Sequence, residues 1–391
     1  KGVTGREILG DGHSGRFDWP VRMAFHSEFS LEVEADDYET AASDIRPVQE
    51  GTQTFEFRLR LGGHASGRVV DAAGRPVARA VVGLNGLGFG FLVRDRHTFS
   101  GSGAPQVLTD AEGLFSIGLR LNTESLVVVH DAGIAQIPVA QAKRATIVLQ
   151  PWGAIEGVAL TAGQPAAGQS VSLHTWMSES DAEPPGATLD HEVTTDAQGR
   201  FRFDHVPPGL VTLSRKYKFS PGTIGINGYG PRQRVDVPAG GVAEVTLATS
   251  GRALVGRFDL SQPIAGYQWR DDLQKLEEVR PDLPPIKAIG SPDDRAELAK
   301  HFRAYERRQA QIRSFFPNIQ PDGSFRMDDV PEGTYTLKLR IAVPPTDPDD
   351  ENQRFFRPEL GKLEVPVVVP AGDFNDPPLD LGTITIPVKE R

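Results

Sequence analysis

Two histidines with neighbouring carboxylates form the most suggestive set of metal ligands in the sequence. His174 ends an alternating segment that we expect to be a strand, and His191 lies between Asp190 and Glu192. If the two segments were neighbouring strands, imidazole and carboxylate groups together could hold a divalent cation. Solvated histidines at strand ends and in loops are the simpler interpretation. We therefore predict no metal site.

The motifs that carry catalysis are absent from the sequence. It contains no His-Glu-x-x-His, no Gly-x-Ser-x-Gly and no phosphate-binding loop. It also contains no cysteine, which excludes disulfides, thiolate catalysis and zinc sites built from cysteine. The prediction is a chain that is not an enzyme, with no catalytic residues and no cofactor.

Aromatic residues in expected loops are the candidate ligand contacts. Trp176 opens a long polar loop after an alternating segment, Tyr229 ends a glycine-rich run over 222–230, and Trp269 lies in or near another loop. Exposed rings can stack on sugars, so these loops could contact a glycan or a peptide. Burial in a core, or in a contact between modules, is the alternative for each tryptophan.

Charge and hydropathy narrow the class of protein. The chain has 391 residues, a net charge of −10 and 39% hydrophobic residues, which is enough for packed cores. No basic face for a nucleic acid is evident, and no apolar run approaches the roughly 18 residues of a membrane-spanning helix. No signal peptide is visible, and the chain opens inside what looks like a module. We expect a mature or trimmed piece of a longer product.

One short motif occurs four times: glycine, any residue, phenylalanine, any residue, and an apolar residue. It begins at Gly15, Gly113, Gly199 and Gly323, with Asp110 and Asp196 three residues before their glycines and Asp322 directly before its own. The carboxylate is expected to accept backbone N–H groups, the glycine to take a positive φ, and the phenylalanine to start a strand with its ring buried. Each turn offers too few oxygens for calcium, and the acidic stretch 347–351 is expected to be a solvated loop.

The motif and its flanking segments predict an all-β chain of tandem modules. Segments with period-two alternation, bounded by Gly, Pro and Asp, indicate short strands at regular spacing. The expected boundaries are a partial module over 1–62 and full modules over 63–150, 151–250 and 251–391. The first shows only its later strands, such as 55–59. The linkers are very short, which favours a semi-rigid rod.

The last module carries about 38 extra residues, part of which has a helical pattern. Ser291 is a plausible N-cap and Pro292 fits the first helical position. Apolar residues then fall close to one stripe: Leu298, Phe302, Tyr305, Ile312 and Phe316. We predict a helical insertion near 291–316 that packs outside the third sandwich.

The order of these motifs resembles the carboxypeptidase regulatory-like family. It runs Gly-x-Val, Asp-x-x-Gly-x-Pro-Val, Thr-Asp-x-x-Gly-x-Phe and Val-Pro-x-Gly, and is clearest over 65–84, 107–117, 153–173, 193–213 and 319–339. The resemblance implies Ig-like, transthyretin-like seven-stranded β-sandwiches. It also implies a place outside the cytoplasm, as spacer or accessory modules of bacterial envelope proteins. The family has no common catalytic residues to carry over.

Related collagen-adhesin B-type repeats can hold a Lys–Asn isopeptide bond. Arg68, Glu156 and Arg257 occupy the places where the resemblance would put the lysine. We therefore expect no such crosslink.

The preferred functional hypothesis is a non-enzymatic structural or interaction segment. Its expected partners are other protein chains or missing parts of the same polypeptide, and a strand from another chain could complete the partial first module, giving a homo-oligomer or filament. One alternative is an accessory module that binds a carbohydrate, such as a cell-surface glycan, or a peptide through the Trp176 and Tyr229 loops. Another is the regulatory stalk of a larger enzyme. No nucleic-acid partner and no transmembrane segment are expected.

Overall fold

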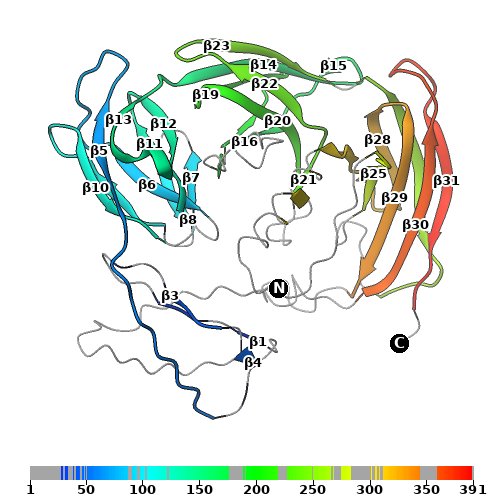
Figure 1. Cartoon of the computed structure of the whole chain (residues 1–391). Coiled ribbons are helices and arrows are strands. Elements are labelled where there is room, and N and C mark those ends of the chain that lie inside the picture. Colours follow the sequence, from blue (N-terminus) through cyan, green and yellow to red (C-terminus); the bar gives the residue numbers. More distant parts are fainter. Residues whose placement is uncertain are drawn as a thin grey trace. The chain divides into compact units, whose positions relative to one another are not determined.

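The chain folds predominantly into β-structure in the part that the computed structural model describes (Figure 1). The described residues are 28–29, 31–33, 38, 41–44, 46–47, 49, 51–86, 90–94, 97–101, 104–120, 123–175, 188–189, 191–218, 227–248, 250–265, 267, 274–282, 301, 304–305, 308, 311–343 and 359–389. Among them, no helix has both the length and the apolar character needed to cross a membrane. Unit 1 contains residues 1–150, 180–188 and 288–300, and unit 2 contains residues 151–179, 189–287 and 301–391.

Unit 1 contains one sandwich, called here the β5 sandwich. One sheet has the order β10-β5-β13, from β5 (His64–Val70), β10 (Leu114–Gly118) and β13 (Lys143–Val148). The other has the order β12-β11-β6-β9, from β6 (Val81–Gly86), β9 (Gln106–Leu108), β11 (Thr123–His130) and β12 (Gly133–Pro138). A 3-10 turn, η1 (Val139–Gln141), precedes β13, and β7 (Gly90–Arg94) pairs with β8 (His97–Gly101). Side chains from both sheets share one core, including Val69, Phe115, Leu84 and Val128.

Unit 2 begins with the β14 sandwich. One sheet joins β14 (Gly153–Thr161) to β15 (Gln164–Pro165), β19 (Arg200–Val206) and β23 (Val242–Leu247). The other has the order β18-β16-β20-β21, with β22 also on β20. Its strands are β16 (Ser170–Thr175), β18 (His191–Thr194), β20 (Gly209–Lys218), β21 (Asn227–Tyr229) and β22 (Gln233–Val237). The two-residue strand β17 (Thr188–Leu189) lies between β16 and β18 in the sequence.

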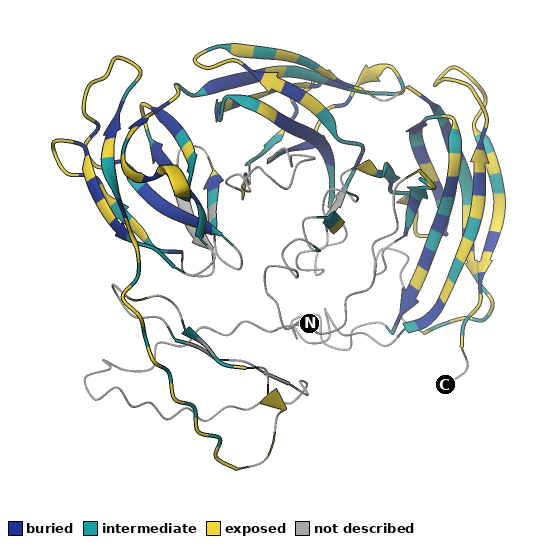
Figure 2. Cartoon of the chain, viewed as in Figure 1, coloured by how far each residue is buried: buried dark blue, intermediate teal, exposed yellow. Residues whose placement is uncertain are grey.

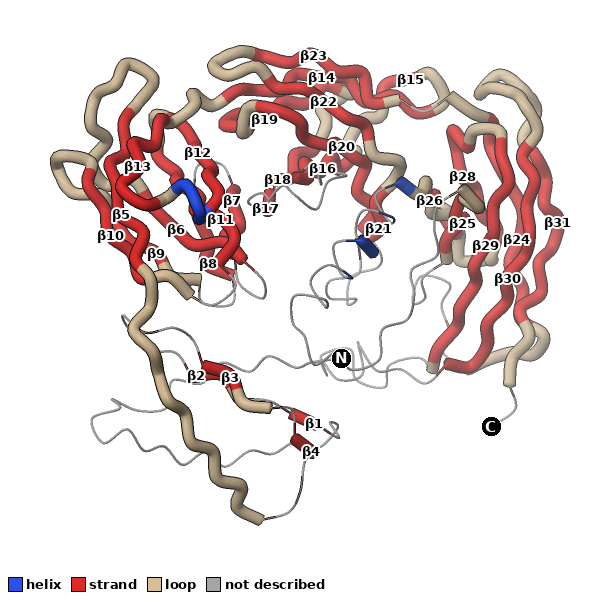
Figure 3. The backbone as a smooth tube through the Cα atoms, viewed as in Figure 1, coloured by secondary structure: helices blue, strands red, loops and turns tan. Residues whose placement is uncertain are grey.

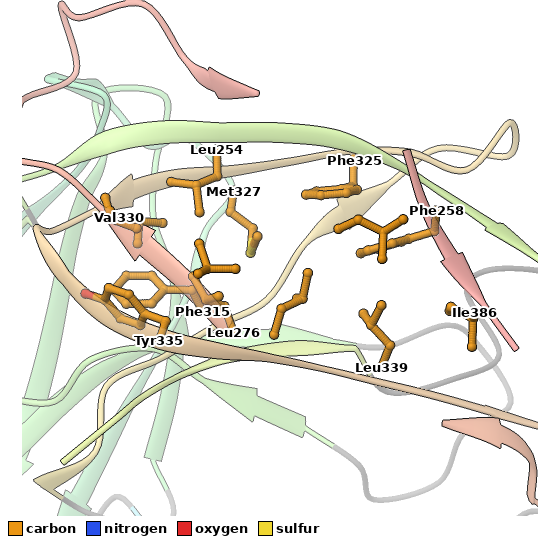
Figure 4. Close-up of a cluster of buried hydrophobic side chains, with 14 of the residues drawn as sticks. Leu254, Phe258, Leu276, Phe315, Phe325, Met327, Val330, Tyr335, Leu339 and Ile386 are labelled. Atoms are coloured by element: carbon orange, nitrogen blue, oxygen red, sulfur yellow. The ribbon is translucent and has the colours of Figure 1, made fainter. Parts of the chain in front are cut away.

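The β24 sandwich completes unit 2. Its sheets have the orders β27-β28-β24-β31 and β26-β25-β29-β30. The first uses β24 (Arg252–Leu260), β27 (Asn318–Ile319), β28 (Ser324–Val330) and β31 (Leu379–Ile386), and the second β25 (Lys275–Glu278), β26 (Ser314–Phe315), β29 (Gly333–Ala342) and β30 (Glu359–Val369). Figure 4 shows Leu254, Phe325 and Phe258 from the first sheet facing Leu276 and Leu339 from the second. The predicted all-β sandwich fold is confirmed.

The motif phenylalanine has the same neighbour in all three sandwiches. Its register partner is a strand glycine, in the pairs Phe115–Gly67, Phe201–Gly157 and Phe325–Gly256. A Cβ atom added at Gly157 would lie 2.5 Å from Cζ of Phe201. The glycine therefore leaves room for the ring to lie across the neighbouring strand.

The turns before these phenylalanines form as expected. Oδ1 of Asp196 accepts the N–H of Gln198 at 2.9 Å and of Arg200 at 2.8 Å, and Asp110 makes the equivalent pair of bonds. The glycines Gly113, Gly199 and Gly323 have φ of +76°, +72° and +85°. The role of Asp110 and Asp196 as turn-formers is thus confirmed, whereas Asp322 lies closer to its glycine and accepts the backbone N–H and the hydroxyl of Ser324.

The N-terminal region is less regular than expected. Its described strands have two residues each: β1 (Glu28–Phe29) pairs with β4 (Arg46–Pro47), and β2 (Glu32–Val33) with β3 (Ala41–Ala42). The motif copy at Gly15 lies outside the described residues. Residues 55–59, predicted as a strand, belong to none of the strands that the structure describes.

The predicted helical insertion near 291–316 is not seen among the described elements. Residues 291–300 lie outside the described residues, and only five described residues between 301 and 311 have helical backbone pairing. The end of the prediction is wrong, because Ser314–Phe315 forms β26 and pairs with β25 (Figure 3). Phe315 is buried in the core, since strand alternation rather than helical spacing directs its side chain inward.

Candidate functional site

Of the three predicted ligand contacts, the structure describes Tyr229 alone. Trp176 and Trp269 lie outside the described residues. Tyr229 ends β21 and is half-buried, with its ring edge-on to His174 at a centroid distance of 4.7 Å. Tyr229 is therefore held against its own sheet, and contact with a ligand stays a prediction.

His174 also lies beside a serine that the sequence analysis missed. Its Nε2 is 2.9 Å from Oγ of Ser214 on the neighbouring strand β20. A serine and a histidine at this distance meet the first requirement for nucleophilic catalysis. Ser214 is completely buried, however, so its hydroxyl is closed to a substrate. The contact with Ser214 instead holds the ring of His174 in place against Tyr229.

The same face of this sheet carries a second polar group. Nζ of Lys216 is 2.5 Å from Glu192, which also accepts the hydroxyl of Ser170. Ser172 and Thr212 on this face are buried, and the hydroxyl of Thr212 lies 3.4 Å from the carbonyl of His174. These groups mainly satisfy one another, as buried polar groups must.

The two histidines considered as metal ligands lie on opposite faces of the sheet. The register of β16 and β18 sets His191 opposite Leu173, whose side chain is in the core. His174 is the next residue and points the other way. The ring of His191 lies 5.1 Å from that of Phe203, so the two imidazoles cannot share a cation. Among the described residues, no group of three or more His, Cys, Asp or Glu side chains could hold a metal ion.

A buried carboxylate joins the two sandwiches of unit 2. Asp329 is 1% exposed and lies one residue before the end of the motif strand β28, with φ of +58°. Its Oδ1 accepts the N–H of Ala162 at 2.9 Å, and its Oδ2 lies 3.4 Å from Nη1 of Arg215. Ala162 and Arg215 belong to the β14 sandwich, so one side chain of the β24 sandwich contacts both the backbone and a cation of its neighbour.

Arg215 lies at an inward position near the end of β20. It shares the face of Val211 and Leu213, is 8% exposed, and also donates to the carbonyl of Leu160. Burial raises the pKa of Asp329 above its usual value, against the lowering effects of the Ala162 N–H and the Arg215 charge. The ion pair is therefore one in which desolvation exceeds the attraction, as is common inside proteins. We call Ala162, Arg215 and Asp329 the polar joint.

Apolar contacts flank the polar joint. The rings of Tyr217, on β20, and Phe316, next to β26, have centroids 5.5 Å apart, and burial raises the pKa of Tyr217. Gly163 has φ of +71°, and a Cβ atom there would come within 2.7 Å of the ring of Phe374. Glycine at 163 thus serves both the turn and the close approach of the second sandwich.

The sequence held two signals for the polar joint. Arg215 follows Val211 and Leu213 at the same alternation, so an arginine stands where an apolar core residue is expected. Asp329 stands where the β14 sandwich has His205, at a positive φ in both copies. Neither signal identifies the partner, because Ala162 and Arg215 are more than 100 residues from Asp329.

No protein-family model matches the chain, and no curated protein matches it. Among solved structures, a candidate carbohydrate binding protein from Pseudomonas aeruginosa is 24% identical over 25% of this chain and 88% of its own, with a TM-score of 0.17. The minor pilin of Streptococcus agalactiae is 11% identical over 46% of this chain and 94% of its own, at 0.24. A streptococcal ancillary pilin is 10% identical over 84% and 100%, at 0.20. TM-scores this low carry no argument, so the resemblance to the carboxypeptidase regulatory-like family stays a prediction.

Proposed function

We propose that this chain is a non-enzymatic structural and interaction segment that acts outside the cytoplasm. It consists of a partial module over 1–62 and sandwich modules over 63–150, 151–250 and 251–391. The polar joint is the observation that supports a structural role, because it fixes one module to the next. The placement outside the cytoplasm is supported by the motif resemblance alone.

The contacts at the polar joint suit a connection that holds the two modules in a fixed geometry. A carboxylate that accepts a backbone N–H of the next module and faces its arginine constrains both direction and distance. The linker Ala248-Thr249-Ser250-Gly251 is short, which leaves little slack between the two modules.

Substitution of Asp329 tests this function. In Asp329→Ala the Ala162 N–H loses its acceptor, Nη1 of Arg215 loses an oxygen partner, and the alanine must keep a left-handed φ near +58°, so we expect loss of coupling between the modules. Exchange of the Ala162 amide hydrogen should become at least roughly tenfold faster, which corresponds to about 1.4 kcal/mol. Small-angle scattering of the full chain should show a wider distribution of dimensions.

Two further variants separate the joint from general damage. Asp329→Asn keeps an oxygen for Ala162 and tolerates positive φ, and the raised pKa of Asp329 indicates that its charge adds little, so its effect should be small. Asp328→Ala removes the neighbouring carboxylate, which pairs with Arg326 at 2.7 Å, and should leave the Ala162 amide protected. Equal exchange rates in Asp329→Ala and the unaltered chain would contradict a structural role for the joint.

A further inference from the structure

Residues 53–60, called here the extended segment, form a strand-like stretch before β5. The segment runs as a long, open path from β4 to β5 (Figure 1). Its residues alternate between half-buried and exposed at every step, which is the period of a β-strand (Figure 2). Nevertheless, these residues belong to none of the sheets that the structure describes.

The two faces of the extended segment differ sharply. The half-buried face carries Phe55, Phe57 and Leu59, with the two phenylalanine rings 6.4 Å apart and the guanidinium of Arg46 4.3 Å from the centroid of Phe55. The exposed face carries Glu56 and Arg58, 3.3 Å apart. Such a segment has the side-chain pattern of a strand that is half-covered by a core.

We propose that the extended segment pairs antiparallel with the same segment of a second copy of this chain, centred on Phe57. In this register Glu56 stands opposite Arg58 of the other copy, and Arg58 opposite its Glu56. Phe55 stands opposite Leu59, and Phe57 opposite itself. Each charge then faces a charge of the opposite sign, and each apolar side chain faces an apolar side chain. The pairs are related by a two-fold axis, as a symmetric dimer requires.

The other registers bring like charges together or set apolar side chains against charged ones. A centre on Glu56 sets that carboxylate against its own copy, and a centre on Arg58 does the same for the guanidinium. A centre on Leu59 sets Arg58 against Arg60. A shift by one residue sets the apolar face against the charged face, and parallel pairing in register puts each charge beside its copy. Among the antiparallel registers of the segment, the one centred on Phe57 is the one that sets both Glu56 and Arg58 opposite a charge of the other sign.

The backbone of the charged residues is available for this ladder. With Phe57 in a non-hydrogen-bonded pair, the bonds come from Thr54, Glu56, Arg58 and Arg60, whose N–H and C=O groups point to one edge. Within the described part of the chain, the main-chain groups of Glu56, Arg58 and Arg60 have no hydrogen-bond partner, and the carbonyl of Thr54 has only a long bond of 3.4 Å from Arg46. An open edge of this kind is a template for strand addition.

This inference deepens the proposed function, because it names a second copy as one partner of the structural segment. The two can fail separately: loss of the dimer leaves the Ala162 exchange experiment unchanged, and a loose polar joint leaves the dimer unchanged.

Charge reversal on the full chain tests the pairing by sedimentation over a range of concentrations. We expect a reversible dimer. Glu56→Arg and Arg58→Glu each set two like charges opposite one another, and each should raise the dissociation constant roughly tenfold or more. The double variant E56R/R58E restores both pairs, so its dissociation constant should return to that of the unaltered chain. Glu244→Arg, at an exposed position of β23, is the control for net charge and should have no effect.

A crosslink gives a second readout that does not depend on charge. The chain has no cysteine, so a single Phe57→Cys variant can form a disulfide only with another copy. In the proposed register residue 57 faces itself with Cα atoms about 4.5 Å apart, within disulfide range, whereas Arg60→Cys places the two thiols about 20 Å apart. Phe57→Cys should give a covalent dimer on mild oxidation and Arg60→Cys should not. A monomer at all concentrations, a dimer indifferent to both reversals, or a double variant as weak as the singles would overturn the proposal.

Discussion

At the scale of single residues, two glycines with the same backbone conformation have different structural roles. Gly168 and Gly199 have φ of +68° and +72°. No atom lies within 4 Å of a Cβ built at Gly168, but one built at Gly199 would lie 2.6 Å from the carbonyl oxygen of Ala159. The first glycine therefore serves the turn alone, and the second also lets β14 approach the motif turn.

Alanine substitutions at Gly168 and Gly199 distinguish the cost of backbone strain from the cost of a steric clash. We expect Gly168→Ala to lower the free energy of unfolding of the β14 sandwich by about 1 kcal/mol, the cost of a left-handed alanine. Gly199→Ala adds a clash with backbone atoms and should cost about 3 kcal/mol in total. Urea unfolding of the full chain, followed by tryptophan fluorescence, measures both. Similar costs for the two variants would show that the β14 backbone moves aside without penalty.

Residue types predicted the turns well and the polar joint poorly. Asp196 and Gly199 act through backbone groups within four residues, so their spacing alone predicts the bonds that they make. Asp329 acts through Ala162 and Arg215, whose proximity depends on how two complete sandwiches meet. Hydrogen bonds within a turn can be predicted from the spacing of residues, whereas a partner far away in the sequence cannot.

At the scale of elements, β25 is stabilised by one carboxylate between two lysines. The register sets Lys275 of β25 directly opposite Lys338 of β29, an arrangement that would repel. Glu277 accepts hydrogen bonds from both lysines and is largely buried. Burial raises the pKa of Glu277, but the bonds from Lys275 and Lys338 outweigh it, and the net effect lowers the pKa.

The lowered pKa of Glu277 determines how the stability of the β24 sandwich depends on pH. The charged form of Glu277 is favoured in the folded state, so its contribution is present above the unfolded value of 4.5 and is lost as the pH falls through the folded value. Glu277→Gln should therefore destabilise the β24 sandwich at neutral pH by about 1 kcal/mol, and the difference from the unaltered chain should vanish in acid. Chemical unfolding at several pH values measures this.

The matched control lies on the next strand. Glu364 of β30 stands opposite Lys338 but is exposed, so Glu364→Gln should change the free energy of unfolding at neutral pH much less. If both variants lost the same free energy of unfolding at neutral pH, the two lysines would not depend on Glu277.

Strand elements were predictable where alternation coincided with a turn signal, as in β19 and β28. The segment 53–60 shows the limit of that reasoning. Its alternation of Phe55, Phe57 and Leu59 predicts a strand, yet a strand exists only where a neighbour supplies hydrogen bonds. The helical pattern over 291–316 failed at its end for a related reason, because Ser314 and Phe315 pair with β25 and tertiary pairing overrides local spacing.

At the scale of the whole molecule, the two units differ in how their parts depend on one another. The core of the β5 sandwich in unit 1 is built from residues of 65–149. In unit 2 the core of the β24 sandwich draws on residues of 254–386, and the polar joint links it to the β14 sandwich. Cooperative unfolding follows contacts of this kind rather than module boundaries.

Dissection of the chain tests that distinction. We expect a fragment of residues 63–150 to fold alone, because the core of the β5 sandwich is built from residues of 65–149, although the fragment lacks β17, which pairs with β7. A fragment of residues 151–391 contains two sandwiches but should unfold in a single calorimetric transition, since opening either sandwich breaks the contacts of Asp329 with Ala162 and Arg215 and the ring contact between Tyr217 and Phe316. In the same fragment, Asp329→Ala should split that transition into two, and Asp328→Ala should leave it single. Two transitions in the unaltered fragment would show that the polar joint is too weak to make the modules cooperate, and the semi-rigid segment would then be a chain of independent domains.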